Sequence, residues 1–117
     1  MNIERGMVVK IDLNPAKGSE TGKTRPGIVV TNNLYNERVP VIQVVPLTTW
    51  SEKKSNIRTN IVIEPTKKNG LKKKSIADCL QTRPLNRRYR LKKVLGKVSD
   101  EDLHKISEAL KTVFGLH

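Results

Sequence analysis

The chain has 117 residues, with 23 lysines and arginines against 11 acidic residues and a formal net charge of +12. A chain of this length builds one hydrophobic core, so we expect a single domain spanning residues 1–117. No stretch approaches the roughly 20 apolar residues that cross a bilayer, and the N-terminal residues lack the apolar segment of a signal peptide. We therefore predict a cytoplasmic protein that does not contact a membrane, and the positive charge indicates a polyanionic partner such as nucleic acid.

Cysteine and histidine are too scarce to build the common catalytic and metal centres. Cys79 is the single cysteine, which excludes an intramolecular disulfide, and its apolar neighbours indicate a thiol in the core. His104 falls in a predicted helix and His117 is the last residue, and neither has a partner at metal or triad spacing. We therefore expect no metal site and no cofactor.

Segments rich in β-branched residues predict a series of short strands. They cover residues 7–13, 27–31, 39–49, 59–64, 74–81 and 90–98. The loop expected over residues 14–25 is long enough to be functional, whereas residues 32–36 have turn chemistry and residues 50–56 resemble a mobile polar loop.

The C-terminal region has the pattern of an amphipathic helix. Ser99 supplies a capping hydroxyl, three acidic residues follow it, and Gly115 ends the pattern. The apolar positions recur at three- and four-residue steps: Leu103, Ile106, Leu110, Val113 and Phe114. Short antiparallel strands followed by one helix predict a mainly β protein, folded as a small, strongly bent β-barrel with the helix packed on its side.

Two polar positions beside predicted strands are candidates for chemistry. Arg25 follows a glycine-containing loop and precedes Pro26, which biases Arg25 toward an extended conformation at a strand entrance. Thr48 and Thr49 follow Pro46 at a strand exit. Arginine can stabilise the negative charge that develops on a phosphorane, and a threonine hydroxyl can donate a further hydrogen bond. RNA carries its own nucleophile, the 2′-OH, so these groups favour RNA over DNA as a substrate; the simpler alternative is a solvated surface arginine.

The positive charge is concentrated in one part of the chain. Between residues 67 and 97, twelve residues are lysine or arginine and only Asp78 is acidic. The arginines of this region favour phosphate contacts, because a guanidinium group matches phosphate oxygens bidentately: Arg83, Arg87, Arg88 and Arg90. Only 3% of the residues are aromatic, which disfavours binding by base stacking alone.

Three motifs resemble those of the MazF/PemK family of toxin endoribonucleases from type II toxin–antitoxin systems. The motifs are Arg5-Gly6 with Asp12-Leu13-Asn14-Pro15 and Gly18-Ser19-Glu20 through Arg25-Pro26, then Val44-Val45-Pro46-Leu47-Thr48-Thr49, then Ala77-Asp78-Cys79-Leu80-Gln81-Thr82. The resemblance covers essentially the whole chain, including the terminal helix. The first two motifs together are specific to the family.

The resemblance implies an SH3-like barrel of the CcdB/MazF type, a homodimer, and a sequence-specific, metal-independent endoribonuclease that cleaves single-stranded RNA such as mRNA. Its products would be a 2′,3′-cyclic phosphate and a 5′-hydroxyl. It also implies a cognate antitoxin with an acidic, disordered tail. By position, Arg25 and Thr48 match the catalytic residues of the family. RNA-binding roles follow for Glu20, Lys23, Thr24, Thr49, Asp78, Gln81 and Arg83.

The third motif departs from the family pattern. Cys79 stands where the family has glutamine and Gln81 where it has a basic residue, and Arg83 is the candidate substitute two positions later. The departure implies a difference in base recognition or in part of phosphate binding. Two other functions also stay open. One is a non-catalytic toxin of the same fold that binds a protein such as a topoisomerase, and the other is a basic nucleic-acid-binding module.

Overall fold

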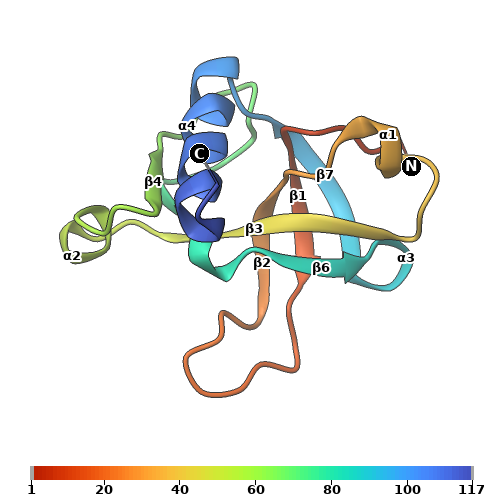
Figure 1. The fold of residues 1–117 in the computed structure, drawn as a ribbon, viewed down its shortest axis with the longest axis horizontal. Helices are drawn as coiled ribbons and strands as arrows, with labels where there is room; N and C mark the ends of the chain where they lie inside the picture. The colour runs from red at the N-terminus through yellow and green to blue at the C-terminus, as the bar shows by residue number, and fades with distance from the viewer. Residues whose placement is uncertain (1, 117) are drawn as a thin grey trace.

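The computed structural model describes residues 2–116 of the chain as an antiparallel sheet with a C-terminal helix (Figure 1). The strands are β1 (Met7–Asp12), β2 (Thr24–Val29), β3 (Val41–Thr49), β4 (Asn60–Ile63), β5 (Ser75–Asp78), β6 (Arg83–Asn86) and β7 (Leu91–Lys97). The helices are α1 (Asn33–Asn36), α2 (Glu52–Ser55), α3 (Arg87–Arg90) and α4 (Asp100–Phe114), with a 3₁₀ turn over Cys79–Gln81. None of the helices within residues 2–116 is long and apolar enough to span a membrane.

The sheet is strongly bent but its hydrogen-bonded ladder stays open. The strands follow the order β4-β5-β3-β2-β1-β7, and β6 also pairs with β3. Every pairing is antiparallel. Among the described residues no pairing joins the end strands β4 and β7. The predicted mainly β class with a terminal helix is confirmed, and the barrel is incompletely closed.

β3 is the central strand, and its partner changes at Pro46. β2 pairs with it through Ile28↔Val45 and Gly27↔Pro46. The Gln43 carbonyl accepts a hydrogen bond from the Val30 N–H, so Gln43, Val45 and Leu47 direct their backbone groups toward β2. The next bonded pair would be Pro26 with Leu47, and Pro26 has no N–H to donate. Beyond Pro46 β3 pairs with β5 on the opposite side from β2, from Leu47↔Ala77 onward. Within the described residues the β2 side of β3 therefore has no ladder partner after Pro46.

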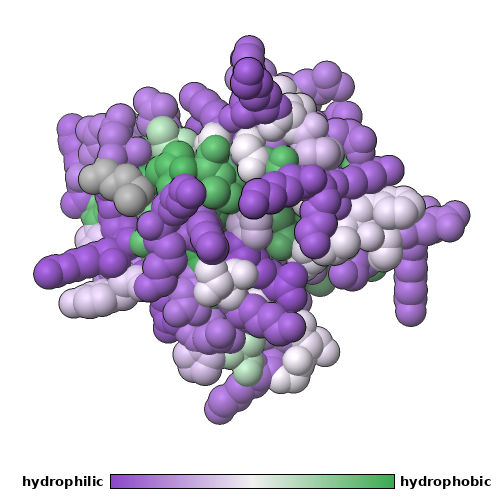
Figure 2. Space-filling view, turned by 180° about the vertical axis from the view of Figure 1, so that it is seen from behind, coloured by the Kyte–Doolittle hydropathy of each residue, from purple (hydrophilic) through white to green (hydrophobic). Residues whose placement is uncertain are grey.

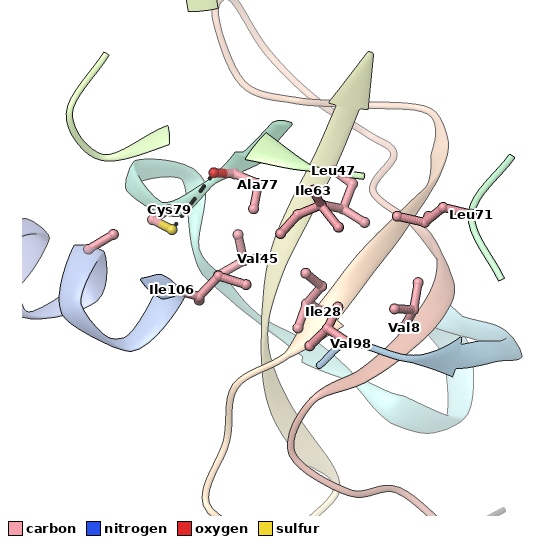
Figure 3. Close-up of a cluster of buried hydrophobic side chains, with 11 residues drawn as sticks. Val8, Ile28, Val45, Leu47, Ile63, Leu71, Ala77, Cys79, Val98 and Ile106 are labelled. Atoms are coloured by element: carbon pink, nitrogen blue, oxygen red, sulfur yellow. Dashed lines mark hydrogen bonds between the residues drawn. The ribbon is translucent and has the colours of Figure 1, made fainter. Parts of the chain in front are cut away.

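Two hydrophobic clusters occupy the two sides of the sheet, because neighbouring strand residues point to opposite faces. Val8 belongs to the first cluster and Val9 to the second. Figure 3 shows the first cluster, in which Ile106 of α4 packs with strand residues. Its members are Val8, Ile28, Val45, Leu47, Ile63, Leu71, Ala77, Cys79, Val98, Ile106 and Ala109. The second cluster contains Ile3, Val9, Ile11, Leu13, Val29, Ile42, Val44 and Leu85.

The C-terminal helix has the predicted caps. The Ser99 hydroxyl oxygen accepts a hydrogen bond from the Asp102 backbone N–H at 3.1 Å, and Gly115 ends the helix in the left-handed conformation. Ile106 and Ala109 are buried against the sheet. Phe114 was expected on this apolar face but is 62% exposed, because it is the last helical residue and lies beyond the buried turns.

Several predicted boundaries are wrong for local reasons. Arg25 is a residue of β2, since its backbone pairs with Ile11 of β1, so the loop covers residues 13–23. Residues 50–56 contain the short helix α2, which Ser51 caps. β6 and α3 were not predicted, because Pro84 and a run of charged side chains hide the pattern of strand and helix.

Two glycines allow the segment before β5 to cross closely over β7. Gly70 has a φ of 70°, and a Cβ there would meet the Leu95 carbonyl. A Cβ on Gly96 would meet the Lys68 carbonyl, which accepts a hydrogen bond from the Lys97 N–H at 2.9 Å. This crossing brings the lysine-rich segment after Gly70 beside β7.

We expect Gly96→Ala to destabilise the fold by about 3 kcal/mol, because the added methyl group forces two backbone segments apart. Urea unfolding followed by circular dichroism measures the change. Gly18→Ala is the control, since no atom lies within 4 Å of the added Cβ; its positive φ alone should cost about 1 kcal/mol. Equal costs for the two variants would contradict the close crossing.

Candidate active site

A cleft of about 420 Å³ opens at the end of the sheet where β2 and β3 part. Arg25 and Thr48 both line it, as do Thr24 and Thr49. The remaining lining residues are Lys10, Pro26, Leu47, Gly70, Leu71, Lys72, Lys73, Ser75, Lys93 and Leu95. The fold thus brings the two predicted catalytic residues, 23 positions apart in sequence, into one cleft.

Strand register explains why Arg25 and Thr48 meet. Gly27↔Pro46 is the last β2–β3 pair, and each candidate residue lies two positions beyond it toward the same end. Because side chains alternate with a period of two, each also shares a face of its own strand with its member of that pair. The two polar side chains therefore flank the point at which the ladder opens.

The Arg25 side chain is anchored at one atom. Its Nε donates a hydrogen bond to the Gly22 carbonyl at 2.8 Å, and the residue is half-buried. Within residues 2–116 its two terminal amino groups have no hydrogen-bond partner. One edge of the guanidinium is thus fixed to the loop, while the other remains available to bind phosphate oxygens.

Glu20 and Lys23 lie on the loop, outside the lining of the cleft. Lys23 has a φ of 66°, and its backbone N–H donates to Asn14 Oδ1 at 2.9 Å. Glu20 Oε1 accepts a hydrogen bond from the Lys17 N–H at 2.7 Å. Both side chains are exposed. Their predicted RNA contacts therefore depend on a ligand that extends from the cleft over the loop.

Gln81 holds the tip of this loop. Its Oε1 accepts a hydrogen bond from the Thr21 N–H at 3.4 Å, and its Nε2 donates to the Ser19 carbonyl at 3.2 Å. These two contacts bracket Glu20 and join segments about 60 residues apart in sequence. Gln81 itself is outside the cleft lining. The structure thus gives Gln81 a role in positioning the loop that contains the Arg25 anchor.

The other candidates from the third motif also lie outside the cleft lining. Burial raises the pKa of Asp78, although backbone hydrogen bonds from Gln81 and Leu80 and the charge of Lys54 oppose the rise. Burial, with the nearby Asp78 charge, raises the pKa of Cys79 to about 12, which makes its thiol unreactive. Arg83 belongs to β6 and pairs with Val44.

Among residues 2–116, four lysines and Arg25 line the cleft, and no carboxylate does. Lys72 and Lys73 are visible in the sequence only as part of a basic run, and nothing in it marks Lys10 or Lys93. Figure 2 shows how thoroughly hydrophilic side chains cover the face opposite that of Figure 1, leaving a limited hydrophobic area. A cationic cleft on this scale favours an anionic ligand.

His104 does not line the cleft. His104 is exposed on α4 and lies 3.8 Å from Glu108, and His117 is outside the described residues. Residues 2–116 contain no group of three or more histidines, cysteines and acidic residues placed to hold a metal ion. The groups available in the cleft are therefore hydroxyls, ammonium groups and one guanidinium.

A basic cleft on a small antiparallel sheet is typical of a protein that binds a polyanion. Comparison with known proteins identifies the family within this class. The family described as "PemK-like, MazF-like toxin of type II toxin-antitoxin system" matches residues 4–114. The chain belongs to this toxin family.

Individual relatives agree with the family. An endoribonuclease MazF of Staphylococcus saprophyticus is 34% identical over 115 residues, covering 98% of this chain and 93% of the relative. The MazF crystal structure from Deinococcus radiodurans superposes with a TM-score of 0.82 at 19% identity, covering 99% of each chain. A mycobacterial endoribonuclease, solved in complex with its cognate antitoxin, has a TM-score of 0.77 at 26% identity, covering 98% of this chain and 97% of that one. The resemblance seen in the sequence motifs is confirmed.

We expect Gln81→Ala to loosen the loop, because two hydrogen bonds to its backbone are lost. The Thr21 amide should exchange with deuterium about 5-fold faster, corresponding to about 1 kcal/mol of lost protection. Hydrogen exchange followed by NMR measures it. Gln43→Ala is the matched control, since only the backbone of Gln43 makes hydrogen bonds within the described residues. Unchanged Thr21 protection in Gln81→Ala would contradict the positioning role.

Proposed function

We propose that this protein is the toxin of a type II toxin–antitoxin system and acts as a sequence-specific, metal-independent endoribonuclease on single-stranded RNA. The observation that carries the proposal is the convergence of Arg25 and Thr48 in one cationic cleft. Family membership supports it, as does the S. saprophyticus relative, which is an endoribonuclease. Single-stranded RNA is favoured because the cleavage needs a free 2′-OH and a flexible backbone.

The proposed reaction is a transesterification within the RNA. The 2′-oxygen attacks the adjacent phosphorus, the bond from phosphorus to the 5′-oxygen breaks, and the products are a 2′,3′-cyclic phosphate and a 5′-hydroxyl. The terminal amino groups of Arg25 stabilise the extra negative charge on the phosphorane oxygens, and the Thr48 hydroxyl donates a further hydrogen bond. The 2′-OH loses its proton to water in the open cleft, and the departing 5′-oxygen gains one.

The same cleft suits regulation by an acidic partner. Mycobacterial and D. radiodurans relatives have been solved with their antitoxins. The net charge of +12 is complementary to the acidic tail that we expect of a cognate antitoxin. Homodimerisation remains a prediction, which light scattering of the purified protein would test.

We place the protein in the cytoplasm, where its proposed mRNA substrate is available, and treat residues 1–117 as one domain. The family match over residues 4–114 and the packing of α4 onto the strands support the single domain. Two alternatives keep the fold without this chemistry: a non-catalytic toxin that targets a protein such as a topoisomerase, and a basic nucleic-acid-binding module. The pairing of Arg25 with Thr48 favours the nuclease over both.

Cleavage of a long single-stranded RNA in the presence of EDTA, with mapping of the new ends, tests the proposal. We expect discrete cuts with 5′-hydroxyl ends in the wild-type protein. Arg25→Ala should slow cleavage by about 100- to 1,000-fold, because it removes the main stabiliser of the phosphorane charge. Thr48→Val, which removes only the hydroxyl, should slow it by about 10- to 100-fold.

Two matched controls lie away from the cleft. Arg38→Ala removes an exposed arginine beside α1, and Thr112→Val removes a hydroxyl that bonds within α4. Both should cleave at the wild-type rate. A folded wild-type protein that cuts no RNA, or an Arg25→Ala variant as active as wild type, would favour one of the non-nuclease alternatives.

A further inference from the structure

Four neighbouring strands each contribute a polar residue to the lining of the cleft. The sheet order runs β3-β2-β1-β7, with Thr48 on β3, Arg25 on β2, Lys10 on β1 and Lys93 on β7. Adjacent strands are about 4.8 Å apart, so β3 and β7 are separated by about 14 Å. The proposed cleavage step uses only Thr48 and Arg25. Lys10 and Lys93 therefore have no assigned role, although they line the same cleft.

Lys10 and Lys93 are directly opposite each other in the β1–β7 ladder. Like charges at opposed positions of an antiparallel pair are destabilising. Neither lysine has an ion-pair partner within residues 2–116. Lys97, on the same strand, has Glu4 at 3.8 Å. The sheet thus keeps two lysines without ion-pair partners at opposed positions, and both line the cleft.

Apolar residues line the cleft together with this lysine pair. Pro26 is opposite Lys10 in the β1–β2 ladder, and Leu47, Leu71 and Leu95 also line the cleft. Its volume of about 420 Å³ is within the range of small-ligand sites. An occupant that fits both parts has an apolar body and a negative charge beyond it. A nucleotide unit of a single strand has this construction.

We propose that Lys10 and Lys93 form a second phosphate site, which binds an RNA backbone phosphate beyond the scissile one while the intervening nucleoside rests on the apolar floor. This inference rests on the proposed function and names where the strand runs from the cleavage point, across β1 and onto β7. One phosphate carries two charged oxygens, so it can bridge both ammonium groups and relieve their repulsion.

An acidic polypeptide is the competing occupant. RNA is favoured because the lysine pair belongs to the same row of strands as Arg25 and Thr48, and hydroxyl groups run alongside that row at Thr24, Thr49 and Ser75. These groups hydrogen-bond to phosphate and sugar oxygens. Lys10 and Lys93 are then positioning residues for the strand, acting on binding rather than on the chemical step.

The test is binding of a fluorescent, mixed-sequence 2′-O-methyl RNA oligonucleotide, which cannot be cleaved, by fluorescence anisotropy over a range of salt concentrations. Lys93→Gln should weaken binding several-fold at low salt. It should also lower the slope of log affinity against log salt by about 0.7, the value for one phosphate contact on a single strand. Lys10→Gln should do the same, and the double variant should lose little more, because both lysines bind one phosphate.

Lys92→Gln is the matched control. Lys92 is the neighbour of Lys93 on β7 and is also exposed. It lies outside the cleft lining, with its Nζ 3.3 Å from the Tyr89 carbonyl. It should leave affinity and salt slope near wild type. On cleavable RNA, Lys93→Gln should raise KM and leave kcat near wild type, since Arg25 and Thr48 are intact.

The outcomes separate this inference from the proposed function. Equal RNA affinities for Lys93→Gln and Lys92→Gln, in a wild-type protein that does cleave RNA, would overturn the second phosphate site alone. A wild-type protein that cuts no RNA, but whose RNA binding depends on Lys93 and not on Lys92, would support the site and remove the nuclease. Binding of polyglutamate that depends on Lys93, without any effect on RNA, would overturn the inference in favour of an acidic polypeptide.

A measurement without any ligand checks the repulsion itself. Lys93→Gln should raise the Tm of the free protein by about 1–3 °C at low salt, because it removes one of two opposed charges. High salt should abolish the gain, since exposed charges are screened. Lys92→Gln should leave the Tm unchanged. A Tm for Lys93→Gln at or below that of wild type in low salt would contradict the repulsion between Lys10 and Lys93.

Discussion

The end of the β2–β3 ladder at Gly27↔Pro46 is the constraint on which the site depends. Pro26 lacks the backbone donor that the next β2–β3 pair would need, so that ladder ends, while β3 continues along β5 on its other side. The two strands still end close together, because the ladder behind the break holds them. Arg25 and Thr48 lie just past this point. The gap where β2 and β3 no longer form hydrogen bonds is therefore the cleft that contains both residues.

The loop between β1 and β2 is fixed by contacts from two directions. The Arg25 guanidinium bonds to the Gly22 carbonyl, and the Gln81 carboxamide bonds on both sides of Glu20. Each contact is modest, since a hydrogen bond in a half-exposed position contributes about 1 kcal/mol. Together they restrict a segment without regular structure, so that the group expected to stabilise the phosphorane is held before a substrate arrives.

Local patterns in the sequence identify elements whose cause is local. The C-terminal helix is correct from Ser99 to Gly115, because caps and apolar spacing are short-range signals, and the family is evident from short motifs around Arg25 and Thr48. β6 could not be found in this way: it contains Pro84 and exists because it pairs with β3. The pairing of Lys10 with Lys93 could not be predicted from the sequence for a related reason. Their meeting depends on the register of two strands from opposite ends of the chain, and that ladder contains irregularities on both sides of the pair.

The burial of Cys79 has a practical consequence for labelling experiments. The only cysteine in the sequence is fully buried beside Ala77 and α4, and its thiol holds its proton at neutral pH. A thiol-reactive dye or spin label therefore does not react with the folded native chain. Any cysteine introduced on the surface, for example at Ser19 on the loop, becomes the one reactive thiol of the folded protein. The movement of that loop can then be followed with a single probe, with no need to replace a residue of the core.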